Sequence, residues 1–352
     1  MIAQSLGPFD AHFLTPAFFE GGRVTVDSTH YIESQSAGAQ PQRIPTHETE
    51  FAKDSVFGYS TSYLPDYVEE KTHGKIAASD VLRLTLDAER QGTAEQLVAL
   101  ENNRCVAVDG ARQSDLDRFA SDVLQTAAQG KKFLFRSAAG LLTSLAALPP
   151  QPVAPEQMHQ FSRGSKESGS KGAIVVGSHV KKTTQQLESL LQLPSVSGIE
   201  IDVAQLKSSS GQPLPVSERK EICDRILAQV HQVYDTGKTP VIFTSRQELT
   251  FSDKATRLAF GEAVSALLVS IDLGLPADLG FLISKGGITT NDVLSQGLAL
   301  TSARLLGQVI PGVSVVTTSP EHHQFPNLPV VLFPGNVGDE AALALAYQRQ
   351  HR

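Results

Sequence analysis

Two glycine-bearing turns near the C-terminus have the residue types and the spacing of a phosphate-binding site. The first turn, SKGGITTND at residues 284–292, follows the apolar run 279–283; the second, PGNVGD at 334–339, follows the apolar run 329–333. Each turn is expected to join the end of a strand to the start of a helix. Such a junction presents unpaired backbone N–H groups and the positive end of a helix dipole, and glycine lets a phosphate approach without a Cβ in the way. The pair indicates a polyphosphate site.

Neither turn matches a standard nucleotide-binding fingerprint. The sequence contains no Gly-x-x-x-x-Gly-Lys-Ser/Thr segment and no Gly-x-Gly-x-x-Gly segment. A single Gly-Gly between a strand and a helix is usually ordinary turn chemistry. The missing Gly-x-Gly-x-x-Gly pattern, with the acidic residue expected about 20 positions beyond it, disfavours a dinucleotide-dependent oxidoreductase.

Together with their surroundings, these turns resemble the four-carbon acid sugar kinase family. The C-terminal nucleotide-binding domain of that family carries a Gly-Gly-x-Thr turn and a later Pro-Gly-Asn-x-Gly turn, as at 286–289 and 334–338. The intervening segment GQVIPGV at 307–313 resembles the family's link between them, so three spaced segments agree in order. The resemblance extends upstream to PAFFEGGR at 16–23, THETEFAKD at 46–54 and VGS at 176–178.

The resemblance implies an ATP-dependent kinase that phosphorylates a hydroxyl of a four-carbon acid sugar, such as a threonate or erythronate relative. It also implies ATP and Mg²⁺ as cofactors. The residues implied to bind the nucleotide are Ser178, Gly286, Gly287, Thr289, Gly335, Asn336 and Gly338. No residue is assigned to catalysis.

Each of these residues also has an ordinary structural role, which the sequence leaves open. Thr289 is a natural N-cap of a helix, Asn336 tolerates a left-handed turn, and Ser178 could cap the helix that follows it. Lys285 and Arg246 also follow predicted strands. Either cation could contact a phosphate or be an ordinary surface residue.

The residues implied to face the acid sugar lie in the N-terminal half of the chain. They are Arg23, Thr46, Glu48 and Asp54. A guanidinium at Arg23 could hold a carboxylate through two parallel hydrogen bonds. The sequence leaves other roles open. Arg23 could be an exposed arginine in a hairpin turn, and the polar segment 46–54 could cap the next helix.

Two motifs of the family have no counterpart in this sequence. Family members begin with a strand and an Asp-Asp-Leu-Thr-Gly turn and later carry Lys-x-x-Asp-Ser-Thr-Leu-Arg-Gly, and both segments help to bind the acid sugar. Because neither occurs here, we expect the chain to correspond to a family member without about the first quarter of its length. The alternative to a kinase is therefore a non-catalytic nucleotide-binding subunit or remnant, whose partner is a separate N-terminal polypeptide. A homodimer is the other association that we expect.

Composition excludes several classes of function. The net charge of −7 comes without a long Lys/Arg cluster, which disfavours a nucleic-acid partner. No run of 18 apolar residues occurs, so no membrane partner is expected. Cys105 and Cys223 lie in apolar patterns and indicate buried thiols in a reducing compartment. The histidines lack the spacing of a metal site. We therefore expect a cytoplasmic protein without a structural metal.

A proline-rich stretch followed by a Ser/Gly/Lys-rich stretch spans 149–171 and predicts an interdomain linker. It would separate a partial acid-sugar-binding domain at 1–148 from a nucleotide-binding domain at 172–352. Both halves alternate strands with helices, so the predicted fold class is α/β with two α/β domains.

The alternation is clearest after the linker. Strands are predicted at 173–176, 198–203, 240–243, 281–283 and 330–333, and helices at 183–191, 216–234, 254–271, 291–307 and 340–350. This order predicts a parallel or mixed sheet covered by helices on both faces. Because ligands gather at the carboxyl ends of such strands, the turns that follow four of them are expected to converge on one ligand.

Overall fold

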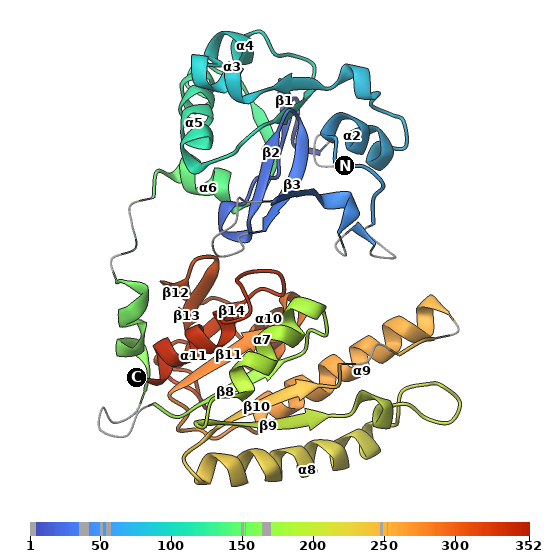
Figure 1. Ribbon diagram of the computed structural model, residues 1–352, viewed down its shortest axis with the longest axis vertical. Coiled ribbons are helices and arrows are strands. Elements are labelled where there is room, and N and C mark those ends of the chain that lie inside the picture. The colour runs from blue at the N-terminus through green and yellow to red at the C-terminus, as the bar shows by residue number, and fades with distance from the viewer. Residues whose placement is uncertain are drawn as a thin grey trace. The chain divides into compact units, whose positions relative to one another are not determined.

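The computed structural model describes residues 5–34, 42–49, 52–53, 58–148, 151, 153–163, 170–246, 249–251 and 253–352. The chain divides into two compact units, Met1–Pro150 and Gln151–Arg352. Each unit contains a sheet with helices packed against it, as Figure 1 shows, which confirms the predicted α/β class. None of the helices within these described ranges is both long and apolar enough to cross a membrane.

The first unit is built on a four-stranded parallel sheet in the order β5-β6-β1-β7. Its strands are β1 (Ala11–Thr15), β5 (Leu82–Leu84), β6 (Arg104–Val108) and β7 (Phe133–Ser137). Successive side chains of a strand point to opposite faces of the sheet. Accordingly, Phe13 packs in one core cluster and Leu14 in another.

Helices cover both faces of this sheet (Figure 1). The cluster around Phe13 includes residues of α5 (Gln113–Ala127), α4 (Ala94–Val98) and α6 (Ala139–Ala146), with α3 (Leu86–Gln91) nearby. The cluster around Leu14 includes residues of α2 (Leu64–Thr72). The carboxyl ends of β1 and β7 therefore lie side by side between two helical layers.

A three-stranded antiparallel sheet adjoins this core. It consists of β2 (Arg23–Val26), β3 (Thr29–Ser34) and β4 (Gln42–Pro45), preceded by the turn η1 (Phe19–Gly21) and followed by η2 (Thr46–Glu48). A further 3-10 turn, η4, spans Ala78–Asp80. The hairpin turn between β2 and β3 holds Asp27 and Ser28 at positive φ of 50° and 60°, as a tight hairpin of this hand requires.

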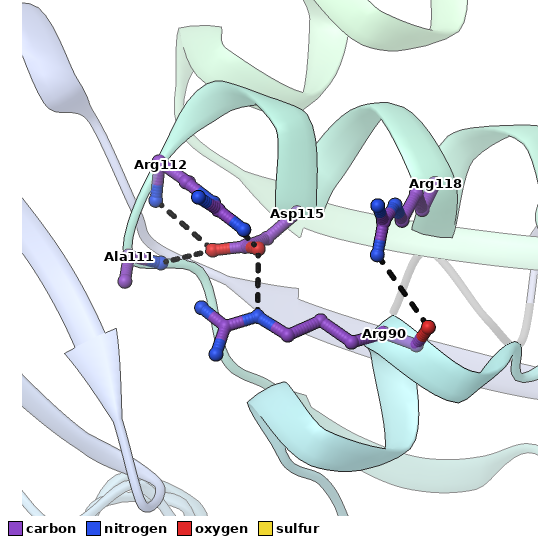
Figure 2. Close-up of polar contacts among 5 residues, drawn as sticks. All are labelled: Arg90, Ala111, Arg112, Asp115 and Arg118. Atoms are coloured by element: carbon purple, nitrogen blue, oxygen red, sulfur yellow. Dashed lines mark hydrogen bonds and ion pairs between the residues drawn. The ribbon is translucent and has the colours of Figure 1, made fainter.

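The start of α5 is fixed by the carboxylate of Asp115, which is 1% exposed (Figure 2). Its Oδ2 accepts hydrogen bonds from the backbone N–H groups of Ala111 and Arg112, both at 3.1 Å. Its Oδ1 accepts from Nε of Arg90 at 3.3 Å. A carboxylate in the first turn satisfies N–H groups that have no partner inside the helix and complements the helix dipole. The cluster is thus a helix cap that also binds α3 to α5.

The second unit contains a seven-stranded mixed sheet in the order β12-β13-β14-β11-β8-β10-β9. Its strands are β8 (Gly172–Val176), β9 (Val196–Ile201), β10 (Thr239–Thr244), β11 (Phe281–Lys285), β12 (Arg304–Ile310), β13 (Val313–Thr317) and β14 (Pro329–Phe333). The five strands from β14 to β9 are parallel, and β12 and β13 pair antiparallel with their neighbours. The predicted parallel or mixed sheet is confirmed.

Helices lie on both faces of this sheet as well (Figure 1). They are α7 (Lys181–Leu191), α8 (Val216–Asp235), α9 (Lys254–Leu273), α10 (Gly287–Asp292) and α11 (Ala342–His351), with a 3-10 turn η6 at Val203–Leu206. Leu282 packs in the cluster that contains residues of α8 and α9. Its neighbour Phe281 points the other way and contacts Tyr347 of α11, with ring centroids 6.1 Å apart.

The predicted helix at 291–307 is wrong in its second half. The structure starts a helix at Gly287, continues it as a π-helical turn, η7 (Val293–Gly297), and places Ala299 at a left-handed φ of 48°. The chain then enters β12, which pairs with β13. The apolar residues of 298–306 have a helical spacing, but strand pairing outweighs this local preference.

The predicted linker at 149–171 contains a 3-10 helix, η5 (Pro155–Phe161). Met158 of this helix is fully buried within the second unit. The amide of Gln151 makes two hydrogen bonds to the backbone of Gln308 on β12, at 3.0 Å and 2.6 Å. These bonds pair the backbone N–H and C=O groups of Gln308, which lies on an edge strand of the sheet. The proline-rich composition did not predict that this segment packs against the second unit.

Candidate functional site

Four neighbouring parallel strands of the second unit, β14, β11, β8 and β10, end at the same edge of the sheet. Each is followed by one of the polar turns that the sequence indicated. The residues predicted to bind nucleotide lie on three of these turns: Ser178 after β8; Gly286, Gly287 and Thr289 after β11; Gly335, Asn336 and Gly338 after β14. The carboxyl edge of a parallel sheet is where α/β proteins bind their ligands.

The turns after β8 and β11 touch each other. The N–H of Gly177 donates a hydrogen bond to the carbonyl oxygen of Lys285 at 3.3 Å. A Cβ added to Gly177 would lie 2.1 Å from Oγ1 of Thr289, so a larger residue does not fit there. Gly286 has φ of +121°, and a Cβ on it would lie 3.2 Å from Cβ of Ser178. Both glycines are thus required by close packing and, at Gly286, by backbone conformation.

The turn after β14 is held against the same place. Oγ1 of Thr183 on α7 lies 3.3 Å from Oγ of Ser178 and 3.4 Å from the carbonyl oxygen of Gly335, so its single hydroxyl hydrogen is shared between these two acceptors. The N–H of Gly286 donates to the carbonyl oxygen of Phe333 at 2.9 Å. These bonds fix the glycine turns relative to one another before any ligand arrives.

Gln186 of α7 fixes the far side of the PGNVGD turn. Its amide nitrogen donates to the carbonyl oxygens of Val337 at 3.0 Å and Asp339 at 2.8 Å. Gly338 has φ of +81°, and a Cβ on it would lie 2.3 Å from Cβ of Ala342. Half-buried Asn336 lies at the tip of this turn. The conformation of the turn is therefore set by a buried side chain and a glycine.

Lys285 is fully buried at the end of β11. Its ammonium donates a hydrogen bond to the carbonyl oxygen of Pro334 at 2.6 Å and lies 4.2 Å from the ring centroid of Phe333. Burial lowers the pKa of Lys285 to about 7, with a smaller contribution from the charge of Lys182. Lys285 is therefore not the ordinary surface residue that the sequence allowed as an alternative.

Arg246 ties the turn after β10 to the turn after β8. Its Nε donates to the carbonyl oxygen of Thr244 at 2.9 Å, and its Nη1 donates to the carbonyl oxygen of Ser178 at 2.7 Å. These bonds position the backbone of Ser178. Within the described part of the chain, Arg246 therefore bonds to backbone carbonyl oxygens and does not form the ordinary surface ion pair that the sequence allowed as an alternative.

A cavity of about 260 Å³ opens beside the turns after β8, β10 and β11. One side is polar, with Gly177, Thr244 and Thr289, and the other is apolar. The apolar wall comes from η6, from α9 and from the segment before α9: Val203, Phe251, Phe260, Val264 and Leu268. A mainly apolar cleft with a few polar groups at one end is typical of small-molecule sites.

Sequence reasoning missed this wall, although a signal was present. Phe260, Val264 and Leu268 follow one another at a spacing of four and so share a helix face. Ile288, inside the SKGGITTND turn, also lines the cavity and is 78% exposed. An exposed apolar side chain at the mouth of a cleft is a common mark of a ligand site.

The first unit contains a second cavity, of about 230 Å³, at the carboxyl ends of β1 and β7. Thr46, predicted to face the acid sugar, is buried and lines it. Arg23 is half-buried on β2, and its charge acts on the nearby His30, which also lines the cavity. Glu48 is exposed and 3.9 Å from Nε2 of His47, outside the lining residues.

Asp54, the fourth predicted residue, lies outside the described residues. The lining also includes residues that sequence reasoning did not identify, among them Ser62, Tyr67 and Arg136. They come from segments far apart in the chain, and no spacing in the sequence connects them.

Two family models match the chain. The nucleotide-binding C-terminal domain matches residues 173–343, and the sugar-binding N-terminal domain matches residues 1–145. No curated protein matches the sequence.

Solved structures with a similar fold include a protein from Salmonella typhimurium LT2, provisionally described as a tRNA synthase. It is 20% identical, with a TM-score of 0.65, over 100% of this chain and 76% of that chain. A Bordetella bronchiseptica domain of unknown function, crystallised with citrate as a domain-swapped dimer, is 18% identical, with a TM-score of 0.39, over 97% of this chain and 73% of that one. The Salmonella structure, with its TM-score of 0.65, shows a shared fold and nothing about the ligand.

The two matching models are the two domains of one family, and each covers the unit of the structure that has the corresponding cavity. Their order along the chain and the glycine turns at one sheet edge agree with that family's organisation. The chain belongs to the four-carbon acid sugar kinase family.

Proposed function

We propose that this protein is an ATP-dependent kinase that phosphorylates a hydroxyl of a four-carbon acid sugar. The observation that carries this proposal is the row of strand-end turns in the nucleotide-binding domain. Gly286 and Gly335 both lie against Ser178, and the neighbouring Gly177 and Thr289 line the cavity of about 260 Å³. Backbone N–H groups at such turns suit the phosphates of a nucleotide. The apolar wall of the cavity suits the base, which has flat apolar faces.

The residues at the site fit ATP by shape and by charge. The turns after β11 and β14 would hold the phosphates, with Gly286, Gly287 and Thr289 on one side and Gly335, Asn336 and Gly338 on the other. Ser178 lies between them, where its hydroxyl accepts from Thr183. The buried ammonium of Lys285 supplies positive charge behind the two turns.

Mg²⁺ is expected to arrive with the nucleotide. It is generally bound by one or two carboxylates together with phosphate oxygens and water, so it needs no ready-made protein cage. Within the described residues, no group of three His, Cys, Asp or Glu side chains forms such a cage. When bound, Mg²⁺ neutralises charge that develops during phosphoryl transfer. The chain's own contribution is to position the nucleotide and the acceptor.

The acceptor would bind in the sugar-binding domain. Thr46 has the most direct support among the predicted residues, because it lines the smaller cavity. The charge of Arg23 helps to lower the pKa of His30, which lines that cavity. Glu48 and Asp54 are proposed from the resemblance alone.

Acid-dependent release of ADP tests this proposal. The protein is incubated with MgATP and a panel that includes threonate, erythronate and the neutral polyol erythritol, and ADP is measured by a coupled assay. We expect release above the background ATPase rate with at least one acid and none above background with erythritol. ATP binding with background release for every acid would refute the kinase proposal.

A second candidate function is a nucleotide-binding subunit that has no turnover of its own. It is favoured by one observation: neither Asp-Asp-Leu-Thr-Gly nor Lys-x-x-Asp-Ser-Thr-Leu-Arg-Gly occurs in the 352 residues. Its partner would be a separate polypeptide that carries those motifs, or a second copy of this chain. ADP release that appears only when such a polypeptide is added would support this candidate over a self-sufficient kinase.

A further inference from the structure

The smaller cavity is lined by residues from six parts of the first unit, one of which is α2 with Leu64 and Tyr67. Leu14 and Pro16 come from the end of β1, His30 from β3, Thr46 from η2, Ser62 from the segment before α2, and Arg136 from β7. Its volume of about 230 Å³ lies below the range of about 300 to 1,000 Å³ that is usual for drug-sized ligands. The cavity therefore suits a small molecule.

Two buried hydroxyl groups are fixed inside this cavity. Oγ of Thr46 and Oγ of Ser62 lie 3.0 Å apart, and Oγ of Ser62 also accepts from the N–H of His47 at 2.8 Å. The carbonyl oxygen of Ser62 accepts from the N–H of His30 at 2.9 Å, which ties this segment to β3. Fixed hydroxyls of this kind can exchange hydrogen bonds with the hydroxyls of a ligand, since each can donate and accept.

The charge of the cavity is positive. None of its lining residues, all of which belong to the described part of the chain, is Asp or Glu. Arg136 carries a full positive charge at the mouth. His30 is neutral at physiological pH because burial, aided by the charge of Arg23, lowers the pKa of its imidazole to about 4. A positive pocket in a chain of net charge −7 indicates an anionic ligand.

The guanidinium of Arg136 is held in place by an aromatic side chain. Its centre lies 5.6 Å from the ring centroid of Tyr67, and its Nη2 donates to the hydroxyl of Tyr67 at 3.1 Å. Tyr67 is itself packed edge-on against Tyr59, with ring centroids 5.3 Å apart. A planar cation fixed by stacking loses little freedom when it binds a carboxylate through two parallel bonds.

The backbone beside Arg136 adds to this preference. Ser137 and Ala138 line the cavity, and α6 begins directly after them. Ala138 is the N-cap of α6, and no side chain caps the helix there. The N-terminus of a helix carries a partial positive charge that stabilises an anion.

From these features we infer that the smaller cavity binds a short hydroxylated carboxylic acid and that Arg136 anchors its carboxylate. Thr46 and Ser62 then hydrogen-bond to hydroxyls of the ligand, and the apolar side chains of Leu14 and Pro16 contact its carbon chain. The inference rests on the proposed function in one respect, since an acid sugar kinase needs such a pocket. It assigns the anchoring role to Arg136 and not to Arg23.

Calorimetric titration with erythronate, threonate and erythritol, without nucleotide, tests this inference. Arg136→Gln removes the cation, and Arg136→Lys keeps a charge without the planar fork. Arg104→Gln is the matched control, because Arg104 is exposed at the other end of a strand in the same sheet. Thermal unfolding of each variant checks that the fold is retained.

We expect the unaltered protein to bind one of the acids and to bind erythritol at least about tenfold more weakly. Arg136→Gln should weaken acid binding about tenfold or more, Arg136→Lys should weaken it less, and Arg104→Gln should leave it unchanged. Equal binding of the acid by Arg136→Gln and the unaltered protein, or no binding of any acid, would overturn the inference.

The result also separates this inference from the proposed function. Acid binding that depends on Arg136 in a protein that never releases ADP would keep the pocket and reject the kinase. Acid-dependent ADP release whose KM for the acid is the same in Arg136→Gln would keep the kinase and reject Arg136 as the anchor.

Discussion

The ammonium of Lys285 donates a hydrogen bond to the carbonyl oxygen of Pro334 at 2.6 Å and so joins the end of β11 to the turn after β14. The carbonyl oxygen of the same lysine accepts from the N–H of Gly177 in the turn after β8. One residue thereby connects three strand-end turns of the nucleotide-binding domain. A change at Lys285 should therefore alter the turns together.

We predict that Lys285→Met weakens ATP binding about tenfold or more, because the turn after β14 loses its anchor. The free energy of unfolding should change little, since a buried charge is removed along with its hydrogen bond and methionine occupies a similar volume. ATP titration and thermal unfolding measure the two effects. Lys238→Met is the control, because Lys238 is exposed and precedes β10. Unchanged ATP affinity in Lys285→Met would show that this anchor is not needed.

The lowered pKa of Lys285, about 7, predicts that ATP binding is linked to protonation. Above this pH the free lysine is largely neutral, and the negative phosphates favour its charged form. At pH 8 the unaltered protein should take up part of a proton per ATP bound, and Lys285→Met should take up less. Titrations in two buffers of different ionisation enthalpy measure this quantity. Equal uptake by both proteins would contradict the prediction.

The same lysine has a consequence for stability. Its pKa is lower in the folded protein than the ordinary value of 10.5, so between about pH 7 and 10.5 the unfolded chain binds more protons. The free energy of unfolding should therefore rise with pH across this window in the unaltered protein, relative to Lys285→Met. Urea unfolding at a series of pH values compares the two. A constant difference between the curves would be inconsistent with the buried ammonium described here.

Asp272 on α9 is fully buried, and within the described residues neither of its carboxylate oxygens has a hydrogen-bond partner. Burial raises the pKa of Asp272 well above its ordinary value. The folded protein thus holds this proton more tightly than the unfolded chain, and stability falls as pH rises above about 4. Asp272→Asn should stabilise the protein by about 1 to 3 kcal/mol at neutral pH and by less at pH 4. Tm values at both pH values test this, and a gain of the same size at pH 4 would contradict it.

Gly287 allows a test of close phosphate approach. Its φ is not in the left-handed region, and a Cβ added to it would meet no atom within 4 Å. Gly287→Ala should therefore leave Tm unchanged or slightly raised. If a phosphate lies against this turn, ATP affinity should still fall about tenfold. Gly237→Ala also adds a methyl group where no atom lies within 4 Å, between α8 and β10, and it is the control for ATP affinity. It is not a control for Tm, because Gly237 has φ of +84° and alanine is strained there, so the Tm of Gly237→Ala should fall. Full ATP affinity in Gly287→Ala would place the phosphates elsewhere.

The arrangement of the second unit could be predicted from sequence because its strands and helices alternate strongly. The apolar runs before 284 and 334 are short and end in glycine turns, which is typical of buried parallel strands. That pattern was enough to place Ser178, Gly286 and Gly335 at one sheet edge. It did not predict β12 and β13, since the residues before Gly307 have a helical spacing and only pairing with β14 selects a strand.

The two cavities could not be predicted in the same way. The lining of the smaller one comes from residues as far apart as His30 and Arg136, and only the parallel pairing of β1 with β7 brings the end of β7 to the end of β1. The burial of Lys285 is likewise a result of tertiary packing, because its sequence neighbours are polar and glycine residues. The positions of turns can be predicted from the sequence, but the burial of a side chain depends on the residues that pack over it.

Calorimetric titration of the unaltered protein with MgATP decides whether the strand-end turns bind a nucleotide. We expect saturable binding with one ATP per chain, weakened in Gly287→Ala and unchanged in Gly237→Ala. An absence of MgATP binding would contradict the assignment of the strand-end turns as a nucleotide site.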